Sequence, residues 1–150
     1  MNKPDSLRRA LTTAIAELAQ NPDKLHCFVQ EGRVISTSAT SLSFEYAYTL
    51  EIIVTDYRDH ADTLIVPILA WLRIHQNEML SNPELMQDGF SFEVDILNHD
   101  TVDLAIKLKL TERVGVHERA GRYVIEHYEE PLAEEDVVNM RAGTMQENAL

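Results

Sequence analysis

Residues 42–54 read LSFEYAYTLEIIV, and their alternation decides the fold. The even positions are apolar or aromatic, and the odd positions are mostly polar or small. A period of two predicts a β-strand with one buried face. At about 3.3 Å per residue the strand would span roughly 43 Å, more than the roughly 38 Å diameter of a compact domain of this size. The strand is therefore expected to bend, to break or to reach beyond its own subunit.

A helix is predicted before this strand. Apolar residues recur at helical spacing from about Pro4 to Gln20. Proline is favoured in a first helical turn, and the pair Asn21-Pro22 is a stop signal. The other side of this segment is polar, so we expect a half-buried helix that packs on a sheet.

A second helix is predicted at residues 62–80, directly after the long strand. Its apolar residues surround Trp71 and leave little polar surface, so most of this helix should be buried. Asp59 or Asp62 is the expected N-cap. Pro67 must lie in the first turn or cause a kink.

Shorter alternating runs predict the remaining strands, at residues 25–37, 90–97, 102–110 and 123–128. The first run is expected to fold back on itself at Glu31-Gly32 as a hairpin. The alternation of the third continues through Val116, which would make a second overlong strand. The order of elements predicts an α+β fold: a mostly antiparallel or mixed β-sheet with two main helices packed against it.

Composition indicates one domain followed by a tail. Apolar residues make up 45% of the chain and charged residues 25%, which are ordinary globular values. We expect residues 1–128 to form a single α+β domain. Residues 129–150 contain six acidic side chains and one arginine, with little apolar content, and are predicted to be an acidic, flexible tail.

Several classes of partner are disfavoured. The net charge of −12 argues against recognition of nucleic acid, which needs clustered lysine and arginine. No run of eighteen apolar residues is present, so no membrane span is expected. The first residues lack the apolar segment of a signal peptide, and the single cysteine, Cys27, fits a reducing cytoplasm.

Catalytic and cofactor motifs are absent from the sequence. The histidines lack a recognised metal-ligand spacing, no serine lies in a G-x-S-x-G pattern, and the five glycines are scattered. The stretch DYRDHAD groups Asp56, Asp59, His60 and Asp62, so an acid–base or metal site stays open as an alternative. The favoured interpretation is a charged turn. We expect no enzyme, no cofactor and no metal.

Contact residues are predicted from the same alternation. If the even face of the long strand meets the helices, its odd face exposes Glu45, Glu51 and Ile53. Ile53 is apolar on that mostly polar face, which favours a protein partner there. Arg113 and Arg119, on the last predicted strands, are expected to meet carboxylates of a neighbour.

Long runs in a fixed order carry a family resemblance. They are KPDSLRRALT, NPDKLHCFV, STSATSLSFEYAYTLEIIVTDY, VPILAWLR, FEVDILN and VDLAIKLKLTERV. Together these runs resemble the tail completion protein R family of contractile-tailed temperate bacteriophages, from about Lys3 to Val116. Residues 117–150 match the family less well. None of these runs is a chemical motif, so the resemblance carries no catalytic residue across.

The resemblance implies a structural protein with a tail-terminator-like fold, a sheet with helices packed against it. Such a protein caps the head-proximal end of the tail tube, stops tail polymerisation and prepares the tail for head joining. The implied partners are further copies in a ring, expected to be a hexamer on the tail, then the tail tube protein and the head–tail connector protein. The implied location is the virion tail, assembled in the host bacterial cytoplasm. The alternative is a connector of the neck, a stopper or an adaptor.

The resemblance also divides the long strand into two parts. Leu50 to Val54 should lie in the central sheet under the Trp71 helix. The end from Leu42 to Tyr46 should lie nearer the periphery, where it could meet a neighbouring subunit.

Overall fold

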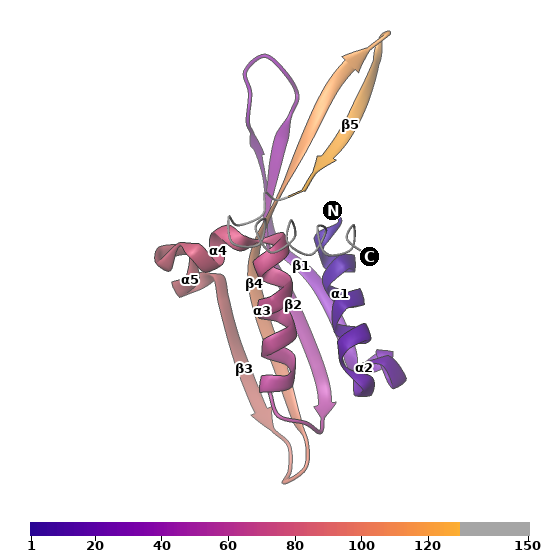
Figure 1. Ribbon diagram of the computed structural model, residues 1–150, viewed down its shortest axis with the longest axis vertical. Helices are drawn as coiled ribbons and strands as arrows, with labels where there is room; N and C mark the ends of the chain where they lie inside the picture. Colours follow the sequence, from indigo (N-terminus) through magenta and orange to yellow (C-terminus); the bar gives the residue numbers. More distant parts are fainter. Residues whose placement is uncertain (130–150) are drawn as a thin grey trace, which may run out of the picture.

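The computed structural model describes residues 1–129 and has an antiparallel five-stranded sheet at its centre (Figure 1). The strands are β1 (Leu25–Ser36), β2 (Phe44–Tyr57), β3 (Phe90–Ile96), β4 (Val102–Arg119) and β5 (Arg122–Tyr128). Their order is β1-β2-β4-β3, and β5 pairs with the distal part of β4. The predicted α+β class, with a mostly antiparallel sheet, is confirmed.

Helices cover one face of this sheet. They are α1 (Lys3–Ala14), α2 (Ala16–Gln20), α3 (Asp62–His75), α4 (Asn77–Ser81) and α5 (Pro83–Gly89), with a short 3₁₀ turn, η1, at Pro22–Lys24. Figure 1 shows α1 and α3 side by side over the sheet, with α4 and α5 at the upper end of α3. The indole Nε1 of Trp71 on α3 donates to Ser6 Oγ on α1 at 3.0 Å and joins the two helices.

The first helix is not continuous, contrary to the sequence prediction. Ile15 adopts an extended conformation, with φ −119° and ψ 109°, and separates α1 from α2. The break turns both Ile15 and Leu18 into the core, where Ile15 is 8% exposed and Leu18 is fully buried. Asn21 follows α2 and ends it, so the predicted stop signal is confirmed.

The second helix is also shorter than the predicted 62–80. It ends at His75 because Gln76, with φ −147°, leaves the helix and points its buried amide at β4. Pro67 lies inside α3, beyond the first turn. The prediction of an aspartate N-cap is wrong, because the N-cap residue is Ala61 and Asp59 Oδ1 instead accepts from the His60 backbone N–H at 2.8 Å.

Strand β1 is one strand and not the predicted hairpin. It pairs with β2 along its whole length, and the register slips by one residue between Gln30 and Arg33. Glu31 has a φ of 52°, so the Glu31-Gly32 pair forms a β-bulge in place of a turn. The chain does change conformation at Glu31-Gly32, but its pairing with the long β2 keeps β1 extended on both sides.

The core lies between β2, β4 and the helices. The even residues Tyr48, Leu50, Ile52 and Val54 of β2 are all buried, the last three completely. They pack against Leu64, Ile68, Trp71 and Leu72 of α3 and against leucines of α1. The prediction that Leu50 to Val54 lies in the central sheet under the Trp71 helix is therefore confirmed.

The distal end of β2 extends beyond this core, as predicted. Two hairpins project from the same end of the sheet (Figure 1). We call residues 33–46, the end of β1 and the start of β2, the first arm, and residues 114–128, the end of β4 with β5, the second arm. Leu42 on the first arm is 62% exposed. The predicted second overlong strand also exists, since β4 has 18 residues.

The tail predicted at 129–150 lies outside the described residues apart from Glu129, and its extent and flexibility stay predictions. In residues 1–129, no helix has the length and apolar character to cross a membrane.

Candidate functional site

The two arms leave the body of the protein beside a buried carboxylate. Glu112 on β4 is 6% exposed. Its Oε1 accepts from the backbone N–H of Asn2 at 2.7 Å and of Lys3 at 3.3 Å, and its Oε2 accepts from the Tyr48 hydroxyl at 2.5 Å. Burial, and then the hydrogen bond to Glu112, raise the pKa of Tyr48. Glu112 therefore ties the start of α1 to the sheet at the base of the arms.

Next to Glu112, side chains take the place of a neighbouring strand and hydrogen-bond the backbone edge of β4. β3 pairs only as far as Leu108, and β5 pairs only from Arg113. Between them, Gln76 Oε1 accepts from the Thr111 N–H at 3.1 Å, and the Lys3 ammonium donates to the Thr111 carbonyl at 2.6 Å. These contacts satisfy backbone groups that a neighbouring strand would otherwise pair. They also explain why α3 stops at His75.

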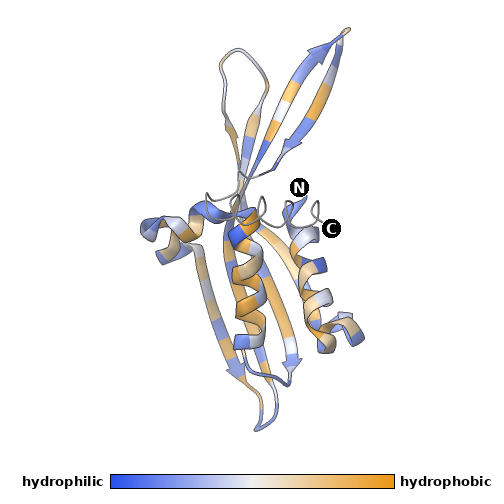
Figure 2. Ribbon diagram, in the orientation of Figure 1, coloured by the Kyte–Doolittle hydropathy of each residue, from blue (hydrophilic) through white to orange (hydrophobic). Residues whose placement is uncertain are grey.

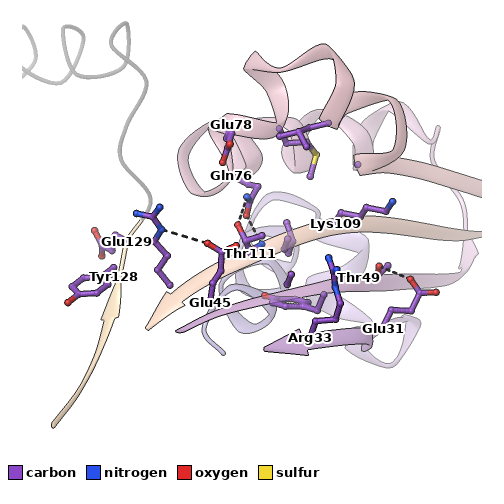
Figure 3. A pocket seen from close by; sticks show the side chains of 17 residues that line it. Glu31, Arg33, Glu45, Thr49, Gln76, Glu78, Lys109, Thr111, Tyr128 and Glu129 are labelled. Atoms are coloured by element: carbon purple, nitrogen blue, oxygen red, sulfur yellow. Dashed lines mark hydrogen bonds and ion pairs between the residues drawn. The ribbon is translucent and has the colours of Figure 1, made fainter. Parts of the chain in front are cut away.

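A cleft of about 740 Å³ opens at this place (Figure 3). Its walls come from β1, β2, β4, α4, α5 and the end of β5. The labelled polar residues that line it are Glu31, Arg33, Glu45, Thr49, Gln76, Glu78, Lys109, Thr111, Tyr128 and Glu129. The lining mixes both signs of charge and contains no serine, cysteine or histidine. Side chains of both signs offer charge-complementary contacts to a protein segment.

The structure brings four of the five predicted contact residues to the helix-free face of the sheet. Glu45 and Arg113 face each other at the cleft, 3.7 Å apart from Oε2 to Nε. Glu51 lies 3.9 Å from the Lys107 ammonium. Ile53 is partly exposed on the same face, while Arg119 lies apart from them, at the tip of the second arm.

The arms expose apolar side chains, and of these the sequence predicted only the outward position of Leu42. On the first arm these are Val34, Ile35 and Leu42, and on the second they are Tyr123, Val124, Ile125 and Tyr128, all at least 41% exposed. Figure 2 shows hydrophobic and hydrophilic residues alternating along the second arm. The alternation was visible in the sequence, but it does not say whether the apolar face meets the protein's own core or another chain. Strand length beyond what one core can cover predicted the outward reach of the Leu42 end, and the same signal in β4 could have found the second arm.

The opposite end of the sheet is acidic. Aspartates gather there from the end of β2, the start of α3 and the β3–β4 turn: Asp56, Asp59, Asp62, Asp95, Asp100 and Asp103. The Asp56 backbone N–H donates to Asp103 Oδ1 at 2.9 Å. Asp56, Asp59, His60 and Asp62 are exposed, and residues 1–129 contain no cluster of three or more His, Cys, Asp or Glu suited to a metal ion. The two ends of the molecule thus differ in chemistry.

Gly115 leaves the space in which the second arm packs against itself. The Tyr128 ring of β5 lies across Gly115 of β4, where a Cβ atom would collide with the phenol. His117 Nε2 lies 3.2 Å from the Tyr128 hydroxyl and helps to hold the ring. An aromatic ring that covers a cross-strand glycine stabilises a twisted strand pair. Gly115 and Tyr128 therefore fix the direction in which the second arm leaves the body.

We expect Gly115→Val to displace Tyr128 and reorient the second arm. Because the arm projects beyond the core, the melting temperature should change by no more than about 3 °C, whereas hydrogen exchange of the β5 amides should become much faster. Gly32→Ala is the matched control, since a Cβ there meets nothing within 4 Å. A Gly115→Val protein whose β5 amides exchange as slowly as those of the Gly32→Ala protein would show that Gly115 and Tyr128 do not fix the arm.

Comparisons with known proteins assign this chain to a family. The family model for P2 phage tail completion protein R (GpR) matches residues 1–131. Tail completion protein R of Escherichia phage P2 is 49% identical over 137 residues, which cover 91% of this chain and 88% of that protein. No solved structure matches the chain. The match over nearly the whole chain shows that this protein belongs to the P2 phage tail completion protein R family.

Proposed function

We propose that this chain is a structural tail completion protein that caps the head-proximal end of the tail tube, stops its polymerisation and prepares the tail for joining to the head. The family assignment supports a structural role in completing a phage tail. The observation that carries the finer proposal is the chemical difference between the two ends of the sheet. One end presents apolar arms, and the other presents aspartates.

That polarity suits a terminator. A tail tube grows as long as each added layer offers the surface that the next layer needs. A cap must match the tube on one face and must not repeat the tube's surface on the other. In this proposal the arms contact the last layer of tube protein, and the acidic end faces the head. Exposed apolar strands recruit a partner by packing and edge pairing, whereas like charges repel a wrong partner.

The cap is a ring of identical subunits, with six copies expected on the tail. Subunits in a ring contact one another head to tail through two different surfaces, and such contacts close when the rotation between subunits allows it. Glu45, Glu51, Ile53, Arg113 and Arg119 are the proposed contacts with neighbouring subunits or tube protein. Four of them share the helix-free face. In this account the protein resides in the virion tail, is assembled in the host cytoplasm and also meets the head–tail connector protein.

Removing the gene from the phage tests this function. Electron microscopy of the lysate should show abnormally long tails, or finished tails that never attach to heads. Tails of normal length beside heads that leak DNA would instead favour the alternative, a stopper or adaptor of the neck. Normal tails joined to full heads would refute both.

The polarity can be tested with an apolar residue of an arm. Ile125→Asp should leave the melting temperature within about 3 °C of the wild type, because Ile125 is 63% exposed. It should prevent capping, because a carboxylate is costly to bury against an apolar tube surface. Asp100→Asn at the other end is the matched control and should cap normally. Capping by the Ile125→Asp protein at wild-type efficiency would contradict the assignment of the arms to the tube.

A further inference from the structure

Strand β3 is an edge strand with an uncovered apolar row. Phe92 pairs in register with Ile106, and Val94 with Leu104. Directly paired residues share a face of the sheet, so this row lies on the face that the helices cover. The helices do not extend over β3 (Figure 1), and Phe92 is 60% and Ile96 79% exposed. The strand also lacks the lysine, proline or bulge that commonly blocks pairing at a free edge.

Strand β1 forms the other edge of the sheet. It is regular from Leu25 to Gln30, up to the Glu31 bulge. Leu25 and Cys27 lie on the helix-covered face, under α1, while Phe28 and Val29 near the edge are 49% and 42% exposed. Within residues 1–129 no further strand pairs with either edge of the sheet, and both edges carry exposed apolar side chains.

The directions of the two edges are compatible. β1, β2, β4 and β3 are neighbours in that order, and every adjacent pair is antiparallel, so β1 and β3 of one subunit run in opposite directions. If a neighbour is placed beside the sheet with its helices on the same side, its β3 is antiparallel to the first subunit's β1. The row that contains Phe92 and Val94 then continues the row that contains Leu25 and Cys27, beside the helices α1 and α2.

Charge favours this pairing over a twofold dimer. The other face of β3 carries Glu93 and Asp95. Pairing of β3 with a second β3 would place these carboxylates opposite carboxylates, which is destabilising. Pairing with β1 places His26 opposite Glu93 when Cys27 meets Phe92, and opposite Asp95 when Cys27 meets Val94. Two different edges in contact also give the head-to-tail geometry that a ring requires.

We propose that the β3 edge of each subunit pairs with the β1 edge of the next, so that the sheets join into one closed antiparallel sheet and the row Phe92, Val94 and Ile96 is covered by the neighbour's α1 and α2. This inference rests on the proposed ring-shaped cap and names the surface that closes it. The partner is a second copy of this chain.

The single cysteine of the chain makes the proposal testable by cross-linking. Cys27 lies on β1 in the row of Ile52, Ile106 and Phe92. Three strand spacings separate it from position 92 of its own subunit, about 14 Å, which is too far for a disulfide. Across the proposed contact, opposed residues on β1 and β3 would have Cα atoms within disulfide range. A disulfide between Cys27 and a new cysteine on β3 therefore has to join two subunits.

Three phages are made, in which this protein carries Phe92→Cys, Val94→Cys or Ile96→Cys. Their assembled tails are oxidised and analysed on non-reducing gels. Oxidation is done at alkaline pH, because burial raises the pKa of the Cys27 thiol. We expect at least one of the three to lose most of its monomer band to a ladder of multimers. Ser91→Cys and Glu93→Cys are the matched controls, since they lie on the opposite face of β3 and should stay monomeric. Cys27→Ser added to the reactive variant should abolish the ladder.

Infectivity of the same lysates, before oxidation, reports on the proposed function separately. Infectious particles that give no ladder at any of the three positions would overturn the β1–β3 contact and leave the cap intact. A dimer that persists in the Cys27→Ser background would overturn it in favour of β3–β3 pairing. If a variant loses infectivity, its thermal unfolding is measured to check that it folds. A variant that unfolds cooperatively is then added to wild-type tail tubes and oxidised there. If it gives no ladder on these tubes, the result also counts against the proposal.

Discussion

Leu50→Ala is expected to destabilise the protein by about 3 kcal/mol, which corresponds to a fall in melting temperature of roughly 10 °C. Leu50 is fully buried on β2, opposite Val29 and Leu108. Its removal leaves a cavity between the sheet and the helices that these side chains cannot fill. Far-UV circular dichroism during heating, or unfolding in urea, measures the loss.

Ile53→Ala is the matched control on the same strand. Ile53 lies on the helix-free face and is partly exposed, so its truncation should cost about 1 kcal/mol or less. If both variants lost the same stability, β2 would not have one core face and one outer face. If Ile53→Ala folds normally but caps tails poorly, the proposed contact role of Ile53 gains support.

Glu112→Ala is expected to cost about 3 kcal/mol, a loss as large as that of Leu50→Ala. The substitution removes the acceptor of the buried Tyr48 hydroxyl and of the N–H groups of Asn2 and Lys3. Donors left without an acceptor inside a protein cost far more than the net value of the bonds they made. The start of α1 should also fray, which hydrogen exchange of the α1 amides would detect.

A double-mutant cycle isolates this contact. Tyr48→Phe removes one donor without creating a cavity and should cost about 1 kcal/mol. In the Tyr48→Phe background, Glu112→Ala should lower the free energy of unfolding by roughly 1 kcal/mol less than in the wild type. The reason is that the Tyr48 hydroxyl, which would be left without an acceptor, is no longer present. Strict additivity of the two losses would mean that the hydroxyl and the carboxylate do not interact in solution.

The sheet and its buried face could be predicted because they rest on a periodicity that the sequence states directly. Tyr48, Leu50, Ile52 and Val54 alternate with polar or small residues, and burial follows the alternation. The second overlong strand, β4, was predicted in the same way. Helix ends at Asn21 and strand bounds near Phe90 also follow from local residue chemistry.

The errors arose where a distant contact overrides a local signal. Glu31-Gly32 has the composition of a hairpin turn, but the long β2 pairs across it and reduces it to a bulge. Gln76 has no tendency to end a helix, yet its amide is needed at the Thr111 edge, more than thirty residues away. The candidate site was found only in part. Glu45, Arg113 and the outward reach of the Leu42 end were predicted, whereas the exposure of Tyr123, Val124 and Ile125 was not, because alternation does not say which chain covers an apolar side.

If this protein caps the tail as proposed, it lies at the head-proximal end, and its position can be seen directly. Intact virions and detached tails, made with the full chain carrying a small epitope, are labelled with gold-conjugated antibody and viewed by electron microscopy. We expect gold at the head-proximal end of the tail and nowhere else. Gold along the tail tube, or at the end far from the head, would contradict it.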